Sequence, residues 1–235
     1  MTDRLAEQIR ARARRLGAIR VAERVSELDE HGLHAQVSID GGRILVYSLI
    51  STEDHVVDVW RNGYCWLSGV VPTLDTVIDL ATAWDSGISL AVARRRWPAL
   101  EYDELAAAHE RGEAVEAQWG MLISDSSLVQ MHDLLVASYA RPRLRVLFPW
   151  VGHLGSRLGF SRCTGYPYTK DIPAIDLINE GFRVTDISAG IVLGQFDDFS
   201  KALDHVVQSI PDWVGPAVPG TADDIDPLPP SDPDR

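Results

Sequence analysis

The stretch of the chain that is richest in chemically useful side chains runs from His153 to Asp171. On a strand over residues 154–162, alternate side chains point to opposite faces, so an imidazole, a guanidinium, a hydroxyl and a thiol share one face. A Gly-Tyr-Pro-Tyr turn follows and adds two aromatic rings. Because an arginine can bind a carboxylate through two parallel hydrogen bonds, the segment predicts a site for a small anion or a peptide carboxylate. The alternative is a solvated strand face followed by an ordinary turn. The candidate ligand-binding residues are His153, Arg157, Ser161, Arg162, Cys163, Tyr166, Tyr168 and Asp171.

Cys163 is a candidate nucleophile only if a histidine acts as its base and a third group orients that histidine. His153 lies ten residues away, roughly 30 Å along an unbroken strand, so the two meet only if the chain bends at the intervening glycines. A small buried side chain is the commoner role for an unpaired cysteine. No catalytic residue is therefore assigned. Histidines from elsewhere that could serve instead are His55, His132 and His205.

Motifs for metals and common cofactors are missing from the sequence. It contains no Cys-x-x-Cys, no His-x-x-x-His and no calcium-loop spacing, so it predicts no metal site. It also lacks the glycine-rich nucleotide loops and the Gly-x-Ser-x-Gly of esterases, so it predicts no cofactor.

The composition narrows the classes of partner. A formal net charge of -12 disfavours nucleic acid, because phosphate contacts need clustered cations. The apolar runs fall far short of the roughly 18 residues of a membrane-spanning helix, and the first residues do not read as a signal peptide. The two cysteines, Cys65 and Cys163, are too few for a disulfide scaffold, so the simplest expectation is a cytoplasmic protein without a membrane partner. Whether the two thiols lie near each other is left open.

The patterning predicts strands, then helices, then strands again. A helix over residues 5–16 leads into an antiparallel meander up to residue 71, with Asn62-Gly63 as a hairpin turn. Helices capped by Thr73 and Ser89 open a helical middle segment. Segregated runs of strands and helices are typical of the α+β class. Further expected helices cover 102–111, 113–123, 127–139 and 197–210, and later strands cover 144–150, 154–162, 182–185 and 187–193.

Two similar stretches suggest an internal repeat. Residues 66–75 and 191–200 each read as an apolar strand, a glycine, a polar cap and the start of an amphipathic helix. We therefore expect one α+β domain over residues 1–215, or two similar halves (about 1–98 and 140–212) joined by a helical segment 99–140. From Pro211 onward the chain holds seven of its thirteen prolines and six aspartates. This composition predicts a disordered acidic, proline-rich tail over residues 216–235.

Several segments together resemble a known family. They are Leu144 to Pro149, Leu158 to Pro167, Val192 to Gly194, Trp84 to Gly87, and Trp97-Pro98. These are similar to an actinobacterial family of unknown function whose members are commonly labelled natural product biosynthesis proteins. The resemblance covers roughly residues 15–215. It implies a genomic neighbourhood, not a reaction, and carries over no catalytic residue.

Three functions are compatible with these observations. The first is an accessory, non-catalytic protein of a biosynthetic pathway that binds a peptide or a partner enzyme, since an exposed strand edge can take up an extended peptide. The second is a tailoring enzyme whose site lies around residues 153–171, with an arginine holding an acidic group. The third is an immunity-type protein that neutralises a basic toxin, for which an acidic charge is suited.

Overall fold

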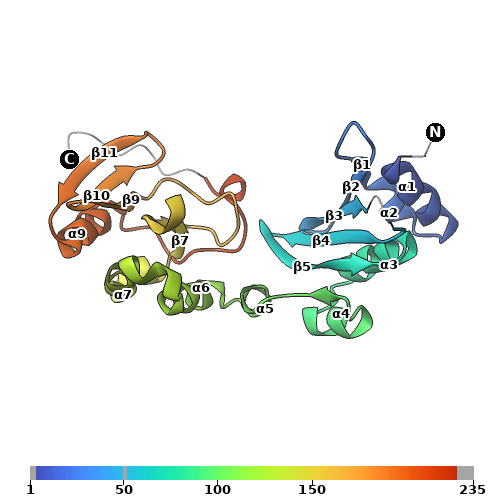
Figure 1. Ribbon diagram of the computed structural model, residues 1–235, viewed down its shortest axis with the longest axis horizontal. Helices are drawn as coiled ribbons and strands as arrows, with labels where there is room; N and C mark the ends of the chain where they lie inside the picture. Colours follow the sequence, from blue (N-terminus) through green and yellow to red (C-terminus); the bar gives the residue numbers. More distant parts are fainter. Residues whose placement is uncertain (1–3, 50–51, 227–235) are drawn as a thin grey trace. The chain divides into compact units, whose positions relative to one another are not determined.

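The computed structural model describes residues 4–49 and 52–226, and the chain divides into two compact units (Figure 1). Unit 1 is Met1–Glu110 and unit 2 is Arg111–Arg235. Each unit holds one antiparallel sheet with helices, which confirms the α+β class and the sheet predicted for each half of the chain. The helical middle is shared between them: α5 (Glu104–Arg111) begins in unit 1, and α6 (Ala114–Ser124) belongs to unit 2.

The sheet of unit 1 is a meander in which each strand pairs with the next along the chain. Its alternating sequence decides which side chains are buried: Ala35, Val37 and Ile39 lie in the core, whereas the residues between them are half-buried. The predicted Asn62-Gly63 turn is confirmed, with φ of 51° and 73° at the two residues. The strands are β1 (Val25–Glu27), β2 (His34–Ile39), β3 (Gly42–Ser48), β4 (His55–Arg61), β5 (Tyr64–Val71) and β6 (Leu100–Glu101).

The helices of unit 1 contribute to the core beneath one face of this sheet. The predicted first helix is confirmed as α1 (Leu5–Arg15), which buries Leu5 and Ile9. Both predicted caps are confirmed as well: the Thr73 hydroxyl accepts a hydrogen bond from the Thr76 N–H, and the Ser89 hydroxyl accepts one from the Val92 N–H. The remaining helices are α2 (Ile19–Glu23), α3 (Leu74–Asp85) and α4 (Leu90–Arg96).

Unit 2 contains a five-stranded sheet in the order β11-β10-β9-β8-β7. Trp119 on α6 anchors its core, because the fully buried indole N–H donates to the carbonyls of Arg145 and Leu147. The strands are β7 (Phe148–Gly152), β8 (Arg157–Ser161), β9 (Ala174–Ile178), β10 (Gly181–Asp186) and β11 (Ile191–Phe196). The helical segments besides α6 are η1 (Ser126–Met131), α7 (His132–Tyr139), α8 (Pro142–Arg145), η2 (His153–Gly155), α9 (Phe199–Ser209) and η3 (Ala222–Asp224).

Two predicted strands in unit 2 have the wrong bounds. Residues 142–145 form α8, because Pro142 at the first helical position has the backbone angle that a helix needs, and the strand begins only at Phe148. The strand predicted over 154–162 is broken at its start by η2, where Leu154 and Gly155 take φ of 56° and 86°. These two left-handed residues reverse the chain, so β8 pairs with β7 and His153 lies outside the strand.

The strand–cap–helix pattern that suggested a repeat is present in both units. In unit 1, β5 is followed by α3, and in unit 2, β11 is followed by α9, whose cap Asp198 accepts a hydrogen bond from the Ser200 N–H. The two strands differ in position: β5 lies inside its sheet, whereas β11 lies at the edge. The predicted hairpin of residues 182–193 is present as β10 and β11, but the strand predicted over 187–193 begins only at Ile191, because residues 187–190 form the turn.

The prediction of a disordered tail is wrong for residues 216–226. The Val218 N–H donates to the Arg162 carbonyl, and the Val218 carbonyl accepts from the Thr164 N–H, so the tail runs beside the end of β8. These backbone hydrogen bonds hold the tail in place, and the polar, proline-rich composition of the tail gives no sign of them. Residues 227–235 lie outside the described residues.

Candidate functional site

Three neighbouring strands of unit 2 bring Arg157, Asp176 and Arg183 into one row. Arg157 on β8 is directly opposite Asp176 on β9, which is directly opposite Arg183 on β10. The Arg157 guanidinium donates to both carboxylate oxygens at 2.5 and 3.1 Å. Arg183 lies at 3.3 Å, and the Thr185 hydroxyl donates at 2.9 Å. Two guanidinium groups therefore converge on a carboxylate that is only 5 % exposed.

This arrangement keeps Asp176 ionised. Burial alone would raise the pKa of its carboxyl group, but hydrogen bonds from Arg157 and Thr185, together with the charges of both arginines, hold the pKa below its ordinary value. Arg157 was predicted to bind an external anion. The chain itself supplies that anion, so this arginine has a structural partner in Asp176.

Ser161 and Cys163 lie in the interior, where they fix the turn that follows β8. Both are fully buried. The Ser161 hydroxyl donates to the Cys163 carbonyl at 2.8 Å and accepts from the N–H groups of Cys163 and Thr169. The Cys163 thiol points at the carbonyl oxygens of Gly165 and Pro167, at 3.5 and 3.7 Å. Carbonyl oxygens accept the thiol hydrogen, an arrangement suited to a structural thiol. The side chain of His153 lies outside the described part of the structure.

Arg162 and Asp171 form an ion pair at the end of β8. The Arg162 Nε donates to Asp171 at 3.0 Å, and both side chains are largely buried, at 12 % and 15 % exposed. The same guanidinium donates to the carbonyl of Asp226 at 2.6 Å, so it connects the strand to the tail. These groups bind each other and the backbone, and so they stabilise the loop of residues 163–171.

The two predicted tyrosines differ in exposure. Tyr168 packs on Phe148 and lies nearly parallel to Trp150, with ring centroids 5.6 and 6.2 Å away. Tyr166 meets Tyr168 edge-on and is 69 % exposed. Seven of the eight predicted side chains are described, and they make separate contacts with one another and with the rest of unit 2.

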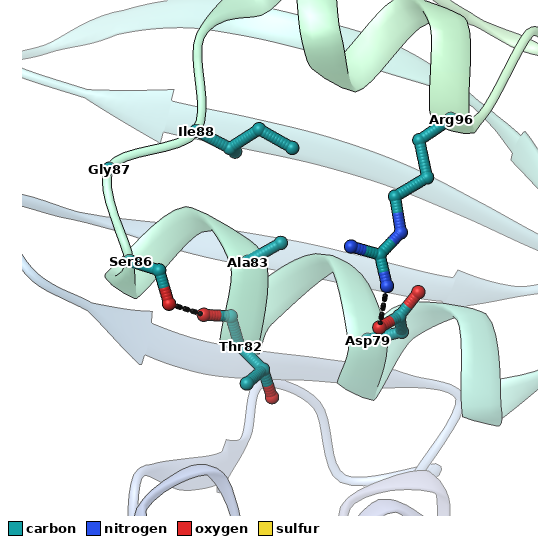
Figure 2. A pocket seen from close by; sticks show the side chains of 7 residues that line it. All are labelled: Asp79, Thr82, Ala83, Ser86, Gly87, Ile88 and Arg96. Carbon is teal, nitrogen blue, oxygen red and sulfur yellow. Dashed lines mark hydrogen bonds and ion pairs between the residues drawn. The ribbon is translucent and has the colours of Figure 1, made fainter.

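A shallow hollow of about 380 Å³ lies between α3 and α4 in unit 1 (Figure 2). Its polar groups already have partners: Arg96 donates to Asp79 at 2.5 Å, and the Ser86 hydroxyl donates to the Thr82 carbonyl at 2.9 Å. Sequence reasoning did not find it because its lining comes from two helices. Since its polar groups bind one another, we assign it no ligand.

The feature that sequence reasoning missed is the exposed edge of the sheet in unit 2. Ile191, Val192 and Leu193 on the edge strand β11 are 53 %, 53 % and 36 % exposed. Natural edge strands are usually protected by charges, prolines, β-bulges or shortness, and β11 has one bulge, at Leu193. β7, at the opposite edge, contains Pro149, and β1 and β6 at the edges of the other sheet have three and two residues. β11 has six residues and neither a charge nor a proline.

Carboxylates stand at both ends of β11. Asp186 precedes the strand and accepts hydrogen bonds from the N–H groups of Ser188 and Ala189, which fix it in the hairpin turn. Asp197 and Asp198 follow the strand directly, and both are exposed, with Asp197 paired to Lys201 at 2.8 Å. An apolar edge is therefore bounded by negative charge at each end. The alternation of the sequence predicted a strand here, but it could not show that the strand lies at an edge.

Comparison with known proteins finds one described family that is similar to unit 2. Residues 113–221 match the model of a family of unknown function, DUF6193. The match takes in β7 to β11 and α9 and leaves unit 1 outside it. No curated protein and no solved structure matches the chain.

Proposed function

We propose that this chain is a non-catalytic binding protein that takes up an extended segment of a partner as an added strand along β11. The observation that carries the proposal is the exposed, uncharged, proline-free edge formed by Ile191–Phe196. An edge strand directs every second pair of backbone N–H and C=O groups away from its sheet. A partner segment that pairs with those groups gains main-chain hydrogen bonds, and its alternate side chains meet the exposed apolar residues.

The composition of this edge defines the segment that fits it. Ile191, Val192 and Leu193 favour apolar side chains at the centre of the partner strand. Asp186 at one end and Asp197 with Asp198 at the other favour lysine or arginine at the termini of the partner segment. A second copy of this chain fits less well, because two chains of net charge -12 repel each other.

A β-bulge limits how far the pairing extends. Thr185 is opposite Val192 and Val184 is opposite Gly194, so Leu193 is an extra residue on β11. The bulge divides the edge into two short runs. We therefore expect recognition of a short segment with weak, reversible affinity.

We infer the biological role of this binding from the sequence resemblance. We place the chain in the cytoplasm, as an accessory protein of an actinobacterial natural-product pathway. Its partner is then a precursor peptide or a pathway enzyme, and neither nucleic acid nor membrane is required. The resemblance is supported by residues 158–167, which begin in β8 of the same sheet.

A pair of synthetic peptides tests the proposal. The probe is acetyl-Lys-Val-Thr-Val-Thr-Val-Lys-amide, and its control has glutamate in place of both lysines. Hydrogen exchange of the full-length chain should show slowed exchange over residues 191–196 with the lysine peptide. The glutamate peptide should bind at least about tenfold more weakly, which is 1.4 kcal/mol.

Variants then locate the binding. Val192→Lys places a charge on the edge and should abolish the protection. Val129→Lys introduces the same charge at an apolar residue of unit 2 that is 74 % exposed, and it should bind like the wild type. Equal binding by the two variants would overturn the proposal. So would a concentration-dependent dimer that only Val192→Lys dissociates, because β11 would then pair with a second copy.

A further inference from the structure

The sheet of unit 1 has a second face that carries half-buried side chains. The buried face contains Val37, Val46, Val57 and Val59, in one core cluster with residues of α1 and α3. The residues between them point the other way and keep part of their surface in contact with solvent. We call this face the open side. It consists of His34, Gln36, Ser38, Arg43, Leu45, Tyr47, Val56, Asp58, Trp60, Cys65, Ser68 and Val70.

Asp58 occupies the centre of the open side. It is opposite Leu45 on β3 and opposite Ser68 on β5, so it lies in the interior of the sheet. The Ser68 hydroxyl donates to its carboxylate at 2.6 Å. No ion pair joins Asp58 to a cation among the residues that the structure describes. Four other aspartates that are partly or largely buried have an arginine: Asp75 pairs with Arg12, Asp85 with Arg24, Asp171 with Arg162, and Asp176 with Arg157. Asp29 and Asp186 instead accept hydrogen bonds from backbone N–H groups.

Aromatic rings surround this carboxylate on the same face. Trp60 follows two residues along β4, and Tyr47 on β3 is opposite Val56, one step diagonal from Asp58. Arg43 places its guanidinium 5.9 Å from the centre of the Trp60 ring, so the chain itself already holds one cation at this ring. The indole N–H of Trp60 is buried and has no hydrogen-bond partner within the described ranges.

The two neighbouring acidic groups, the Cys65 thiol and the Tyr47 hydroxyl, stay uncharged, so Asp58 is the negatively charged group among them. Burial raises the pKa of the Cys65 thiol to about 11, and the charge of Asp58 adds to the effect. Burial also raises the pKa of Tyr47, again with a contribution from Asp58 and an opposing one from Arg43. At neutral pH the centre of the face therefore combines one carboxylate, two aromatic rings and uncharged polar groups, with the Arg43 guanidinium beside Trp60.

We propose that the open side binds an arginine side chain of a basic protein partner, with the guanidinium on the Asp58 carboxylate and its plane against Trp60. A planar guanidinium donates two hydrogen bonds to one carboxylate and stacks on an aromatic ring, whereas an ammonium group does not stack. The net charge of -12 attracts basic proteins and repels acidic ones. This site lies in unit 1, on a different sheet from β11, and it does not depend on the function proposed for that strand.

The test uses the peptide acetyl-Ala-Arg-Ala-amide as probe and its citrulline analogue as control. Citrulline keeps the shape of arginine and removes the charge. Titration of the full-length chain, followed by amide chemical shifts, should give saturable changes over β3, β4 and β5 with the arginine peptide. The citrulline peptide should leave these shifts unchanged.

Two variants separate the site from general charge effects. Asp58→Asn keeps an acceptor for Ser68 and should weaken the binding at least about tenfold. Glu53→Gln removes one charge from an exposed position of the same unit and should not change the affinity. Equal affinities of the two variants, shifts spread over the whole acidic surface, or equal binding of the citrulline peptide would each overturn the proposal.

Discussion

Trp150 is directly opposite Gly159 on the neighbouring strand, and its indole lies over that glycine. A Cβ atom at position 159 would be 2.2 Å from two indole atoms, far inside any real contact. The missing side chain is therefore what allows the indole to lie against the sheet. In that position the ring stacks nearly parallel to Tyr168, which lies in the loop after β8.

Substitution Gly159→Ala should destabilise unit 2. The added methyl group would displace the indole, and overpacking of this kind costs about 1–3 kcal/mol. Urea denaturation followed by tryptophan fluorescence measures the loss. Gly215→Ala is the matched control, because a Cβ atom there meets nothing within 4 Å. If the two variants unfold at the same urea concentration, Trp150 does not cover Gly159.

Gly120→Ala should have the opposite effect. Gly120 lies in the interior of α6, is exposed, and has no atom within 4 Å of an added Cβ. Alanine in a helix interior is more favourable than glycine by about 0.5–1 kcal/mol, because it has less backbone freedom to lose on folding. The same denaturation experiment should show an increase of that size. A decrease would reveal a contact of α6 that the geometry does not contain.

Local signals in the sequence predicted most of unit 1. The stop at Gly17, the Asn62-Gly63 turn and the caps at Thr73 and Ser89 each depend on a few consecutive residues. Such signals are decided by backbone angles and by hydrogen bonds within one turn. The folded structure keeps these local features, because no distant residue competes for the same backbone groups.

The predicted site residues have distant partners that the sequence around them does not show. Arg157 reads as an anion ligand from its neighbours in sequence, but Asp176, nineteen residues later, satisfies it. The strand around Asp176 was itself missed, because a charge in the middle of five residues argues against a buried strand. Only the pairing of β8, β9 and β10 shows that two arginines neutralise that charge.

The edge position of β11 and the absence of an ion pair at Asp58 within the described ranges are also properties of topology. The sequence identifies both segments as strands, but strand order decides which one is left unpaired. Likewise, only the register places Asp58 opposite Leu45 and Ser68. No spacing within a single strand contains that information.

Asp176→Asn should destabilise unit 2 strongly at neutral pH. Removing the charge leaves Arg157 and Arg183 facing each other, with side chains 18 % and 37 % exposed. Breaking a buried ion pair costs about 3–5 kcal/mol, and because both guanidiniums reach solvent we expect about 3 kcal/mol. Denaturation of the two proteins in parallel at pH 7 gives the difference.

The pH dependence of that difference tests the electrostatic cause. The folded-state pKa of Asp176 is below its ordinary value of 3.8. Its stabilising contribution is therefore complete above that ordinary value and is lost as the pH falls through the lower, folded-state pKa. The gap between wild type and Asp176→Asn should narrow below about pH 4. A gap that stays constant down to pH 2.5 would mean that packing, not charge, accounts for the loss.

The reactivity of Cys65 tests the environment of the open side without any ligand. A thiol with a pKa of about 11 has about a hundredfold less thiolate at pH 8 than one with the reference value of 9.0, and only the thiolate reacts with iodoacetamide. Because a thiolate of higher pKa is also more nucleophilic, part of this difference is offset, and in a Cys163→Ala variant the folded chain should be alkylated at least about tenfold more slowly than free cysteine. Because Asp58 contributes to the raised pKa of Cys65, adding Asp58→Asn should speed the reaction. A rate equal to that of free cysteine would show that Cys65 is exposed and not held neutral beside Asp58.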